Sequence, residues 1–280
     1  PAVRRALAAV GIHDIRITRS PGDERRLAAE AAAAGIETIV ALGGDGTWGN
    51  VARGILESGI DARLVPIAAG TGNDFPHALG LPASDPAAMA TIAAGAHAVR
   101  VDLGRANDVP FLNVAGVGLE AAVLEATGRY RLLSGSLVYV AAALPLLRSF
   151  APLRASVSMD GGPPRAGTWL AIVASNGPRF GGGFRVAPGA SVTDGRLDLV
   201  SVRDARPARR LQLFVRARLG SHVSQPEVAL DRIARARLEF DSPPLVDADG
   251  ELHRLDRPEL DLSVLPDALR VGVGEQPASR

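Results

Sequence analysis

The chain has 280 residues, of which 47% are apolar, 22% are charged and none is cysteine. This length can bury a core and accommodate two domains, and the composition is that of a globular protein. Without cysteine there are no disulfides, thiolate metal sites or cysteine nucleophile. The formal net charge of +1 argues against a nucleic-acid-binding protein that relies on bulk phosphate attraction. All 31 basic residues are arginine, which excludes a Walker A loop and a protein kinase, because both need a specific lysine.

No secretory signal or membrane span is expected from the hydropathy pattern. The opening residues carry no extended apolar core, and the longest uncharged run covers residues 132–147. That run contains a proline and is shorter than the ~20 apolar residues that cross a bilayer. We interpret it as a packed helix, and we expect a soluble or peripheral protein.

The first part of the chain alternates predicted strands with predicted helices. The strands cover residues 13–18, 38–42 and 64–69, and the helices cover residues 23–34, 48–58 and 85–94. Glycine follows each of these helices, and Pro86 suits the first turn of the last one. This alternation predicts a parallel sheet, whose ligands gather at the carboxyl ends of the strands.

After residue 98 the pattern changes to short strands separated by turns rich in Gly, Pro and Asp. The predicted strands cover residues 99–103, 111–114, 155–159, 169–174, 196–202 and 236–240, with helical stretches at 119–149 and 207–219. This pattern is typical of an antiparallel sandwich with inserted helices. We therefore predict an α/β nucleotide-binding domain with a parallel sheet over residues 1–98. A β-sandwich-type substrate domain is predicted over residues 99–280, and a return of its C-terminal tail to the first domain is left open.

Two glycine-rich phrases, GGDGT at residues 43–47 and GTGND at residues 70–74, each follow an apolar run that reads as a buried strand. Glycine lets the backbone turn sharply and approach a ligand, and clustered N–H groups there can hold an anion. A carboxylate in such a place would repel phosphate, unless Asp45 holds a metal ion that the phosphate shares. Two such loops, each with an aspartate at a strand end, are a stronger signal than one.

The pair of phrases resembles the diacylglycerol kinase catalytic family, including the related bacterial lipid kinases. Five further segments carry this resemblance in the family's order: VDLG at 101–104, FLNVAGVG at 111–118, the glycine loop at 181–188, DGRLD at 194–198 and DGE at 249–251. One departure lies at the start, because the family's first strand and its Asn-Pro-x-Ser-Gly segment, which touches the nucleotide, do not precede the helix in which we place Pro1.

The resemblance implies that the first loop binds ATP phosphates through its amides and Thr47, with Asp45 linked to Mg²⁺ directly or through water. The alternative is a tight turn in which Asp45 caps the following helix. For the second loop, Thr71 is expected beside the nucleotide, whereas Asn73 serves the turn. The expected nucleotide-binding residues are Gly43, Gly44, Asp45, Gly46, Thr47, Gly70, Thr71 and Asn73.

Two metal sites are implied by the resemblance. Asp74 and Asp102 resemble members of an Asp–water–Mg²⁺ network with Asp45, although alone they fit an Asx turn and an ordinary turn aspartate. Asp194 resembles the ligand of a second, structural Mg²⁺, together with the backbone carbonyls of Ser191 and Arg196. A plain Asp-Gly turn is the alternative for that segment.

The DGE segment at residues 249–251 is the predicted catalytic element. From the pattern alone, Asp249 and Gly250 favour a β-hairpin turn. The resemblance implies instead that Glu251 is the general base that accepts the proton of the attacking lipid hydroxyl. Asp249 would then position Glu251 or contact the metal.

The resulting hypothesis is an ATP- and Mg²⁺-dependent lipid kinase, with diacylglycerol converted to phosphatidic acid as the leading example. The implied partners are the lipid and, transiently, a membrane surface on the cytoplasmic side, and a homodimer is left open. NAD kinases also carry GGDGT in a similar two-domain arrangement, but their second motif centres on an Asn-Glu pair. Sphingoid-base kinases usually read Gly-Ser-Gly-Asn-Ala there, so Asp74 and Phe75 favour the diacylglycerol branch. A catalytically silent nucleotide- or lipid-binding regulator is the alternative from another class.

Overall fold

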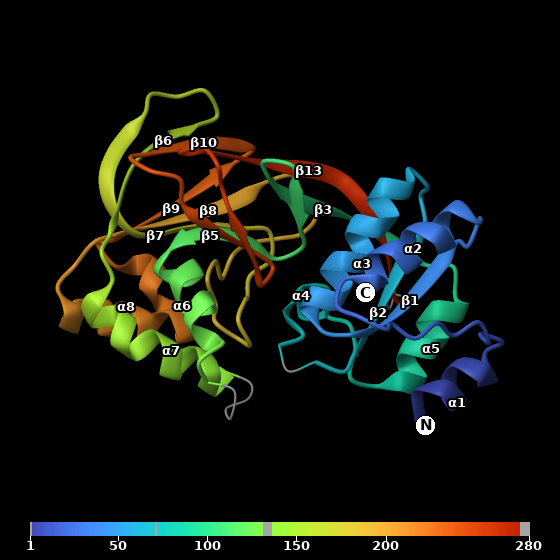
Figure 1. Ribbon diagram of the computed structural model, residues 1–280. Helices are drawn as coiled ribbons and strands as arrows, with labels where there is room; N and C mark the ends of the chain where they lie inside the picture. Colours follow the sequence, from blue (N-terminus) through green and yellow to red (C-terminus); the bar gives the residue numbers. More distant parts are fainter. Residues whose placement is uncertain (1, 71, 131–135, 275–280) are drawn as a thin grey trace, which may run out of the picture. The chain divides into compact units, whose positions relative to one another are not determined.

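The structure, a computed structural model, describes residues 2–70, 72–130 and 136–274. These residues form two compact units, one made of residues 2–102 with 267–274 and the other of residues 103–266 (Figure 1). The chain passes between the units along strands β3 (Ala98–Ala106) and β13 (Glu259–Gly272). The predicted domain boundary near residue 98 falls at the first residue of β3 and stays a prediction.

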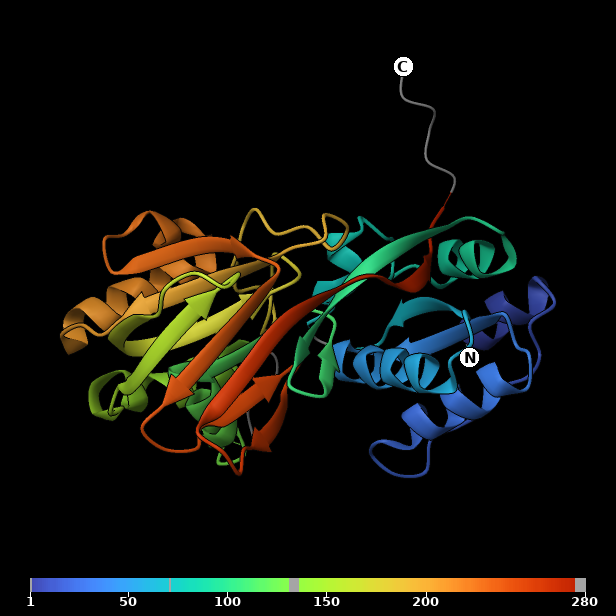
Figure 2. The same ribbon diagram turned by 90° about the horizontal axis from the view of Figure 1, so that it is seen from above.

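Unit 1 is built on a parallel sheet. Strands β1 (Thr38–Gly43) and β2 (Arg63–Ala68) run parallel, and the end of β13 adds to the other side of β2, also in parallel. The helices that cover this sheet are α1 (Ala2–Ala9), α2 (Asp23–Ala33), α3 (Asp45–Ser58), α4 (Asp74–Ala78) and α5 (Pro86–Ala94). Helices α2 and α3 pack together on one face, and α1 and α5 share an apolar cluster with β2 on the other (Figure 2).

Three predicted elements of unit 1 differ from the structure. Residues 13–18 do not form a strand, because no ladder partner lies beside them among the described residues, and Ile15 and Ile17 are exposed. Helix α3 already begins at Asp45, so the DGT part of the first loop is its first turn. Helix α5 begins at Pro86, with Asp85 as the N-cap whose carboxylate accepts hydrogen bonds from the N–H groups of Ala87 and Ala88.

Unit 2 is an antiparallel β structure. Its strands, besides parts of β3 and β13, are β4 (Val109–Phe111), β5 (Val114–Gly118), β6 (Leu153–Met159), β7 (Arg165–Ser175), β8 (Leu197–Arg203), β9 (Val228–Ile233), β10 (Arg235–Phe240), β11 (Leu245–Ala248) and β12 (Glu251–Arg254). The long strand β7 pairs with β5, β6 and β8, and a bulge near Trp169 marks the change of register. Strand β5 continues to β11, and β11 to β12.

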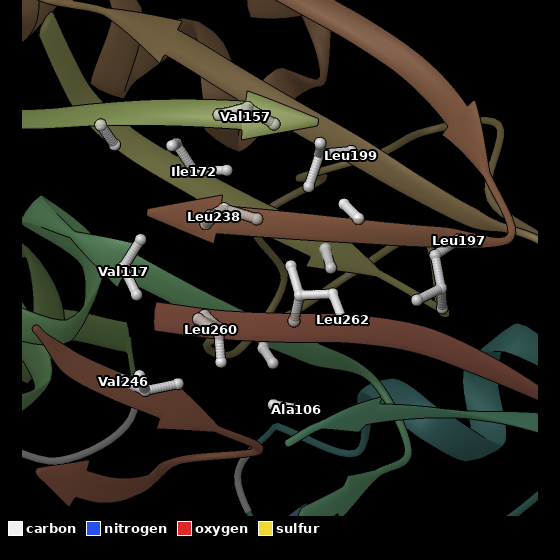
Figure 3. Packing of buried hydrophobic residues seen from close by; sticks show 14 of the residues in the cluster. Ala106, Val117, Val157, Ile172, Leu197, Leu199, Leu238, Val246, Leu260 and Leu262 are labelled. Carbon is white, nitrogen blue, oxygen red and sulfur yellow. The ribbon is translucent and has the colours of Figure 1, made fainter. Parts of the chain in front are cut away.

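A large apolar core fills the space between these strands. Val117, Val157, Ile172, Leu199 and their neighbours point into it from several strands (Figure 3). Helices α6 (Leu119–Thr127), α7 (Ser136–Ser149) and α8 (Pro207–Leu219) lie on the other side of β7 (Figure 1). The 3-10 helix η1 (Ser221–Ser224) packs beside α8 and β9. A second apolar cluster joins the α-helices to that side (Figure 1).

The predicted fold class is confirmed, because a parallel α/β unit precedes an antiparallel unit with inserted helices. Within unit 2, the strand predicted at 111–114 is interrupted by a bend between β4 and β5, and the helical stretch at 119–149 is two helices. Part of the predicted run at 132–147 forms α7, and its first residues lie outside the described residues. Strands β9, β11, β12 and β13 were not predicted, because their sequences are short or contain several charged residues.

Candidate functional site

The two glycine-rich loops lie side by side at the carboxyl ends of β1 and β2. The parallel register pairs Gly43 with Ala68, so the two chains leave the sheet together. The N–H groups of Ala69 and Gly70 both donate to the carbonyl oxygen of Gly43, at 2.7 and 3.1 Å. The structure therefore brings together the predicted nucleotide-binding residues of both loops, apart from Thr71, which lies outside the described residues.

Three of these glycines lie where there is little space for a side chain. A Cβ atom on Gly70 would lie 2.7 Å from the Cα of Gly44, and one on Gly44 would lie 3.3 Å from the Cα of Gly70. A Cβ atom on Gly43 would overlap with the Thr47 side chain. Gly46 differs, because no atom lies within 4 Å of the position of its Cβ, so the start of α3 is open at this point.

Asp45 connects the first loop to the second. It is the first residue of α3, and its carboxylate accepts hydrogen bonds from the N–H groups of Asp74 and Phe75, at 3.2 and 3.0 Å. These N–H groups belong to the first turn of α4, whose N-cap residue Asn73 makes no side-chain cap. Asn73 instead has a φ of 56° and donates to the carbonyl oxygen of Gly70. Asp45 thus caps α4, a helix that is distant from it in sequence.

Asp74 and Asp102 are both buried, with 4% and 2% of their surface exposed. One oxygen of Asp102 accepts the N–H of Asp267 at 2.9 Å. Within the described part of the chain, no three His, Asp or Glu side chains gather in a way that could hold a metal ion. The structure therefore places Asp45 next to the start of α4, but it does not assemble Asp45, Asp74 and Asp102 into one cluster.

The start of α3 suits a phosphate group. The first N–H groups of a helix have no partner within it, and the aligned peptide dipoles favour an anion at this end. Helix α3 has 14 residues, and the open space at Gly46 lies in its first turn. Magnesium commonly takes only one or two protein carboxylates together with substrate phosphates. An ion bound in this way does not need a preformed cluster of protein carboxylates.

The predicted catalytic segment is the turn of the β11–β12 hairpin. Ala248 and Glu251 pair across the hairpin, so Asp249 and Gly250 form a two-residue loop. Both loop residues have positive φ values, 54° and 87°, as a type I′ turn requires. The hairpin predicted from the pattern is therefore present, and it places the partly exposed Glu251 at the start of β12.

Asp249 fixes this hairpin to the β4–β5 segment. Its carboxylate accepts hydrogen bonds from the backbone N–H groups of Leu112, Asn113 and Val114, the last two at 2.8 and 3.1 Å. Its own N–H donates to the carbonyl oxygen of Val114 at 3.0 Å. Asn176 holds the same segment, because its side-chain amide donates to the carbonyl oxygen of Leu112. Two of the quoted segments, FLNVAGVG and DGE, thus meet in the fold.

Two buried acids beside this turn were not found from the sequence. Asp247 is fully buried, and its Oδ1 accepts the N–H of Gly250 at 2.7 Å. Burial raises the pKa of Glu120 well above its ordinary value, and the charge and hydrogen bond of Asp247 raise it further. Burial also raises the pKa of Asp247, against the opposing hydrogen bonds from Glu120 and Gly250. The sequence does carry a signal for these two acids, because each of them lies within an apolar run.

The third predicted acidic site lies in the turn before β8. Asp194 Oδ1 accepts the N–H of Arg196 at 3.0 Å, as in an Asp-Gly turn, and its other oxygen pairs with the guanidinium of Arg232. The hydroxyl of Ser191 lies 3.2 Å from that of Thr193. The structure thus brings Ser191, Asp194 and Arg196 into one turn. The positive charge beside Asp194 comes from the guanidinium of Arg232, where Mg²⁺ is expected from the sequence.

Unit 2 also contains an apolar cavity of about 170 Å³. Its walls come mainly from α6, α7, α8 and strands β7 and β8, with side chains such as Val123, Leu170, Val202 and Phe214. Glu120 and Asp247 also line it, as does the buried His222, whose pKa is lowered by burial. A cavity of about 150 Å³ with apolar walls takes up benzene-sized guests in a model protein, so this one has room for an apolar group.

Among the residues that the structure describes, no helix is both long and apolar enough to cross a membrane. Comparison with known families matches residues 1–106 to the diacylglycerol kinase catalytic domain. Residues 113–273 match the YegS C-terminal NAD kinase beta sandwich-like domain.

Among curated proteins, the chain is similar to a diacylglycerol kinase of Bacillus subtilis (strain 168). The two are 28% identical over 235 residues, which cover 84% of this chain and 77% of the relative. The chain is also 32% identical over 263 residues to a "Probable lipid kinase YegS-like" protein of Pseudomonas aeruginosa (strain UCBPP-PA14), covering 92% of this chain and 83% of the relative.

Solved structures share the fold. A crystal structure of a diacylglycerol kinase from Bacillus anthracis str. Sterne aligns with a TM-score of 0.72 at 20% identity, covering 96% of this chain and 88% of that one. An NAD kinase from Archaeoglobus fulgidus in complex with ATP aligns with a TM-score of 0.57 at 13% identity, covering 98% and 88%. The predicted resemblance is confirmed by the family models and the curated relatives.

Proposed function

This chain belongs to the diacylglycerol kinase catalytic family, and we propose that it transfers the γ-phosphoryl group of ATP to a lipid hydroxyl, with diacylglycerol as acceptor and phosphatidic acid as product. The observation that carries the lipid acceptor is the apolar cavity of unit 2. An acyl chain gains free energy by leaving water for such a cavity, whereas the polar NAD molecule does not.

The start of α3 is the proposed phosphate site. The N–H groups of its first turn and the open space at Gly46 would hold the phosphates, and Thr47 would add a hydroxyl donor. Asp45 and Asp74 would hold Mg²⁺, which when bound neutralises charge on the transferred group. Asp45 has a second task there, because its hydrogen bonds to α4 keep the two loops together.

Glu251 is the proposed general base. A carboxylate that accepts the proton of the attacking hydroxyl must be held in place and yet be accessible to the substrate. The hairpin meets both conditions, since Asp249 is held by three backbone N–H groups and Glu251 is partly exposed. Asp249 accordingly has the role of a positioning residue in this proposal.

Phosphate transfer from labelled ATP with Mg²⁺ tests the proposal, with micelle-dispersed lipids and NAD as alternative acceptors. We expect a product on diacylglycerol and a loss of activity in Glu251→Gln. Glu239→Gln is the matched control, because Glu239 is an exposed glutamate on β10 of the same unit. It should retain the wild-type rate.

Other outcomes would identify a different function. Transfer to NAD alone would assign the chain to NAD kinase chemistry, and transfer to a sphingoid base alone would change the acceptor. ATP binding without transfer to any acceptor would contradict a kinase and favour a nucleotide- or lipid-binding regulator.

A further inference from the structure

The carboxyl groups of Glu120 and Asp247 meet behind the DGE turn, and the strand geometry explains why. Gly116 on β5 and Asp247 on β11 are paired residues in an antiparallel ladder, next to the pair Val117 and Val246. Both valines belong to the sandwich core (Figure 3). Because side chains alternate between the faces of a strand, Gly116 and Asp247 face the other side, which carries α6.

Glu120 fills the space that Gly116 leaves. It lies in the first turn of α6, which directly follows β5 (Figure 1). A Cβ atom on Gly116 would overlap with the Glu120 carboxylate, so glycine at this position admits the acid. The Glu120 carboxyl therefore lies over the strand pair and within hydrogen-bond reach of Asp247.

Three of the four carboxyl oxygens of this pair lack a hydrogen-bond donor in the described part of the chain. In the described residues, no N–H or O–H group donates to either Glu120 oxygen or to Asp247 Oδ2, and all three atoms are buried. Two buried carboxylates cannot satisfy each other without a proton between them. Asp247 already accepts the N–H of Gly250, and a hydrogen bond of this kind favours its charged form. Among the described residues no group donates to Glu120, so we assign the proton to Glu120 and treat Asp247 as its acceptor.

We propose that Glu120 is a positioning residue for the turn that carries Glu251, acting as a neutral acid that donates its proton to Asp247, whose other oxygen holds the N–H of Gly250. The importance of this chain of hydrogen bonds for phosphoryl transfer rests on the proposed function. The contacts themselves do not depend on the proposed function, because they lie within one unit. They lead from Glu120 to Asp247, from Asp247 to the N–H of Gly250, and from Gly250 to the next residue, Glu251.

Electrostatic repulsion explains why the partner of Asp247 should be neutral. The charge of Glu251 raises the pKa of Asp247, so these two carboxylates repel each other. A hydrogen bond from a neutral Glu120 offsets that repulsion without adding a third charge. Both Glu120 and Asp247 line the apolar cavity, where apolar walls limit the water that could replace the donor. Without this donor, Oδ2 of Asp247 would have no partner, and we expect the side chain to rotate and release the N–H of Gly250.

Two substitutions of Glu120 separate this role from simple packing. Glu120→Gln keeps the size, the neutral state and an N–H donor, whereas Glu120→Leu fills the space without a donor. Glu125→Gln and Glu125→Leu are the matched controls, because Glu125 lies on the exposed side of the same helix. Each variant is measured for kcat and KM in lipid phosphorylation and, by ¹⁵N NMR on the full chain, for hydrogen exchange of the Gly250 amide.

We expect Glu120→Gln to keep kcat within about threefold of wild type and to keep the Gly250 amide protected. Glu120→Leu should lower kcat about tenfold or more with the KM for ATP unchanged, and should speed Gly250 exchange at least tenfold. Both Glu125 variants should resemble the wild type.

Unchanged Gly250 exchange in a folded Glu120→Leu protein would overturn the proposal, as would equal damage from Gln and Leu. The amide readout needs no turnover. A wild-type protein that transfers no phosphate would therefore contradict the proposed function, while Gly250 exchange would still decide the role of Glu120.

Discussion

The carboxylate of Asp45 accepts the backbone N–H of Asp74 at 3.2 Å, and that of the next residue, Phe75, at 3.0 Å. One aspartate of the first glycine-rich loop thus closes the short helix that begins with the aspartate of the second loop. A carboxylate at a helix start satisfies N–H groups that the helix leaves unpaired and interacts favourably with its dipole. The two loops therefore form one structural unit, and a change in Asp45 affects both.

Substitutions of Asp45 should separate its structural task from its proposed metal-binding task. We expect Asp45→Ala to lower the free energy of unfolding by about 0.5–2 kcal/mol, the usual effect of removing a cap. Asp45→Asn keeps an oxygen acceptor and should cost less, yet it should abolish most phosphoryl transfer because the charge is lost. Urea unfolding and the transfer rate measure the two effects. An active Asp45→Asn protein would show that Asp45 only caps α4.

Gly46 and Gly70 should respond in opposite ways to alanine. Gly70→Ala places a Cβ atom 2.7 Å from Gly44, and we expect a loss of about 1–3 kcal/mol of stability from overpacking. Gly46→Ala meets no neighbour and lies in a helix, so it should be neutral or stabilising by up to about 1 kcal/mol. The same methyl group would occupy the proposed phosphate site. We expect ATP affinity to fall at least tenfold in Gly46→Ala, as measured by calorimetry, and undiminished affinity would place the phosphates elsewhere.

Asp249 should be more important for folding than its position in a hairpin turn suggests. Its carboxylate accepts three backbone N–H groups in a buried place, and a buried donor left without a partner costs about 1–3 kcal/mol. Asp249→Ala should therefore lower stability by several kcal/mol, whereas Asp249→Asn keeps one acceptor oxygen and should lower it less. Glu251→Gln, two residues away, should leave thermal unfolding nearly unchanged. Equal melting temperatures for all three variants would contradict this assignment.

The hydrophobic pattern and the glycine-rich phrases were sufficient to predict the fold class, because strands such as β1, β2 and β7 contain apolar runs that the pattern identifies. Residues 13–18 show the limit of such patterns, since a strand also needs a neighbour that its own residues do not encode. The cap that Asp45 provides to α4 was not predicted, because spacing identifies neighbours in sequence and α4 is a neighbour only in space. Glu120 and Asp247 were missed for the same reason, as their partnership depends on the register of β5 and β11.

The stability of the protein should depend on pH through Glu120. Its pKa is raised well above 4.5 in the folded protein by burial, Asp247 and their hydrogen bond, so the folded state keeps a proton that the unfolded chain releases. The stabilisation is complete below pH 4.5 and is lost as the pH rises toward the folded pKa. Glutamine stays neutral throughout. We therefore expect the stability of Glu120→Gln relative to wild type to increase with pH above 4.5, by at most about 1.4 kcal/mol per pH unit. Urea unfolding at several pH values checks this, with Glu125→Gln as control, and a pH-independent difference would mean that Glu120 is ionised in the fold.

Filling the apolar cavity should weaken lipid binding and leave nucleotide binding unchanged. Val202 lines the cavity from β8 and is partly buried, so Val202→Phe adds volume where we propose that an acyl chain binds. Overpacking costs about 1–3 kcal/mol in a filled core, but part of the added ring can enter the cavity. We expect the KM for dispersed diacylglycerol to rise about tenfold, with ATP affinity unchanged because the glycine-rich loops belong to the other unit. Val215→Phe on α8 is the control, since Val215 is 55% exposed and does not line the cavity. An unchanged KM in Val202→Phe would mean that the lipid binds outside this cavity, whereas a fall in ATP affinity would mean that the substitution disturbs the fold.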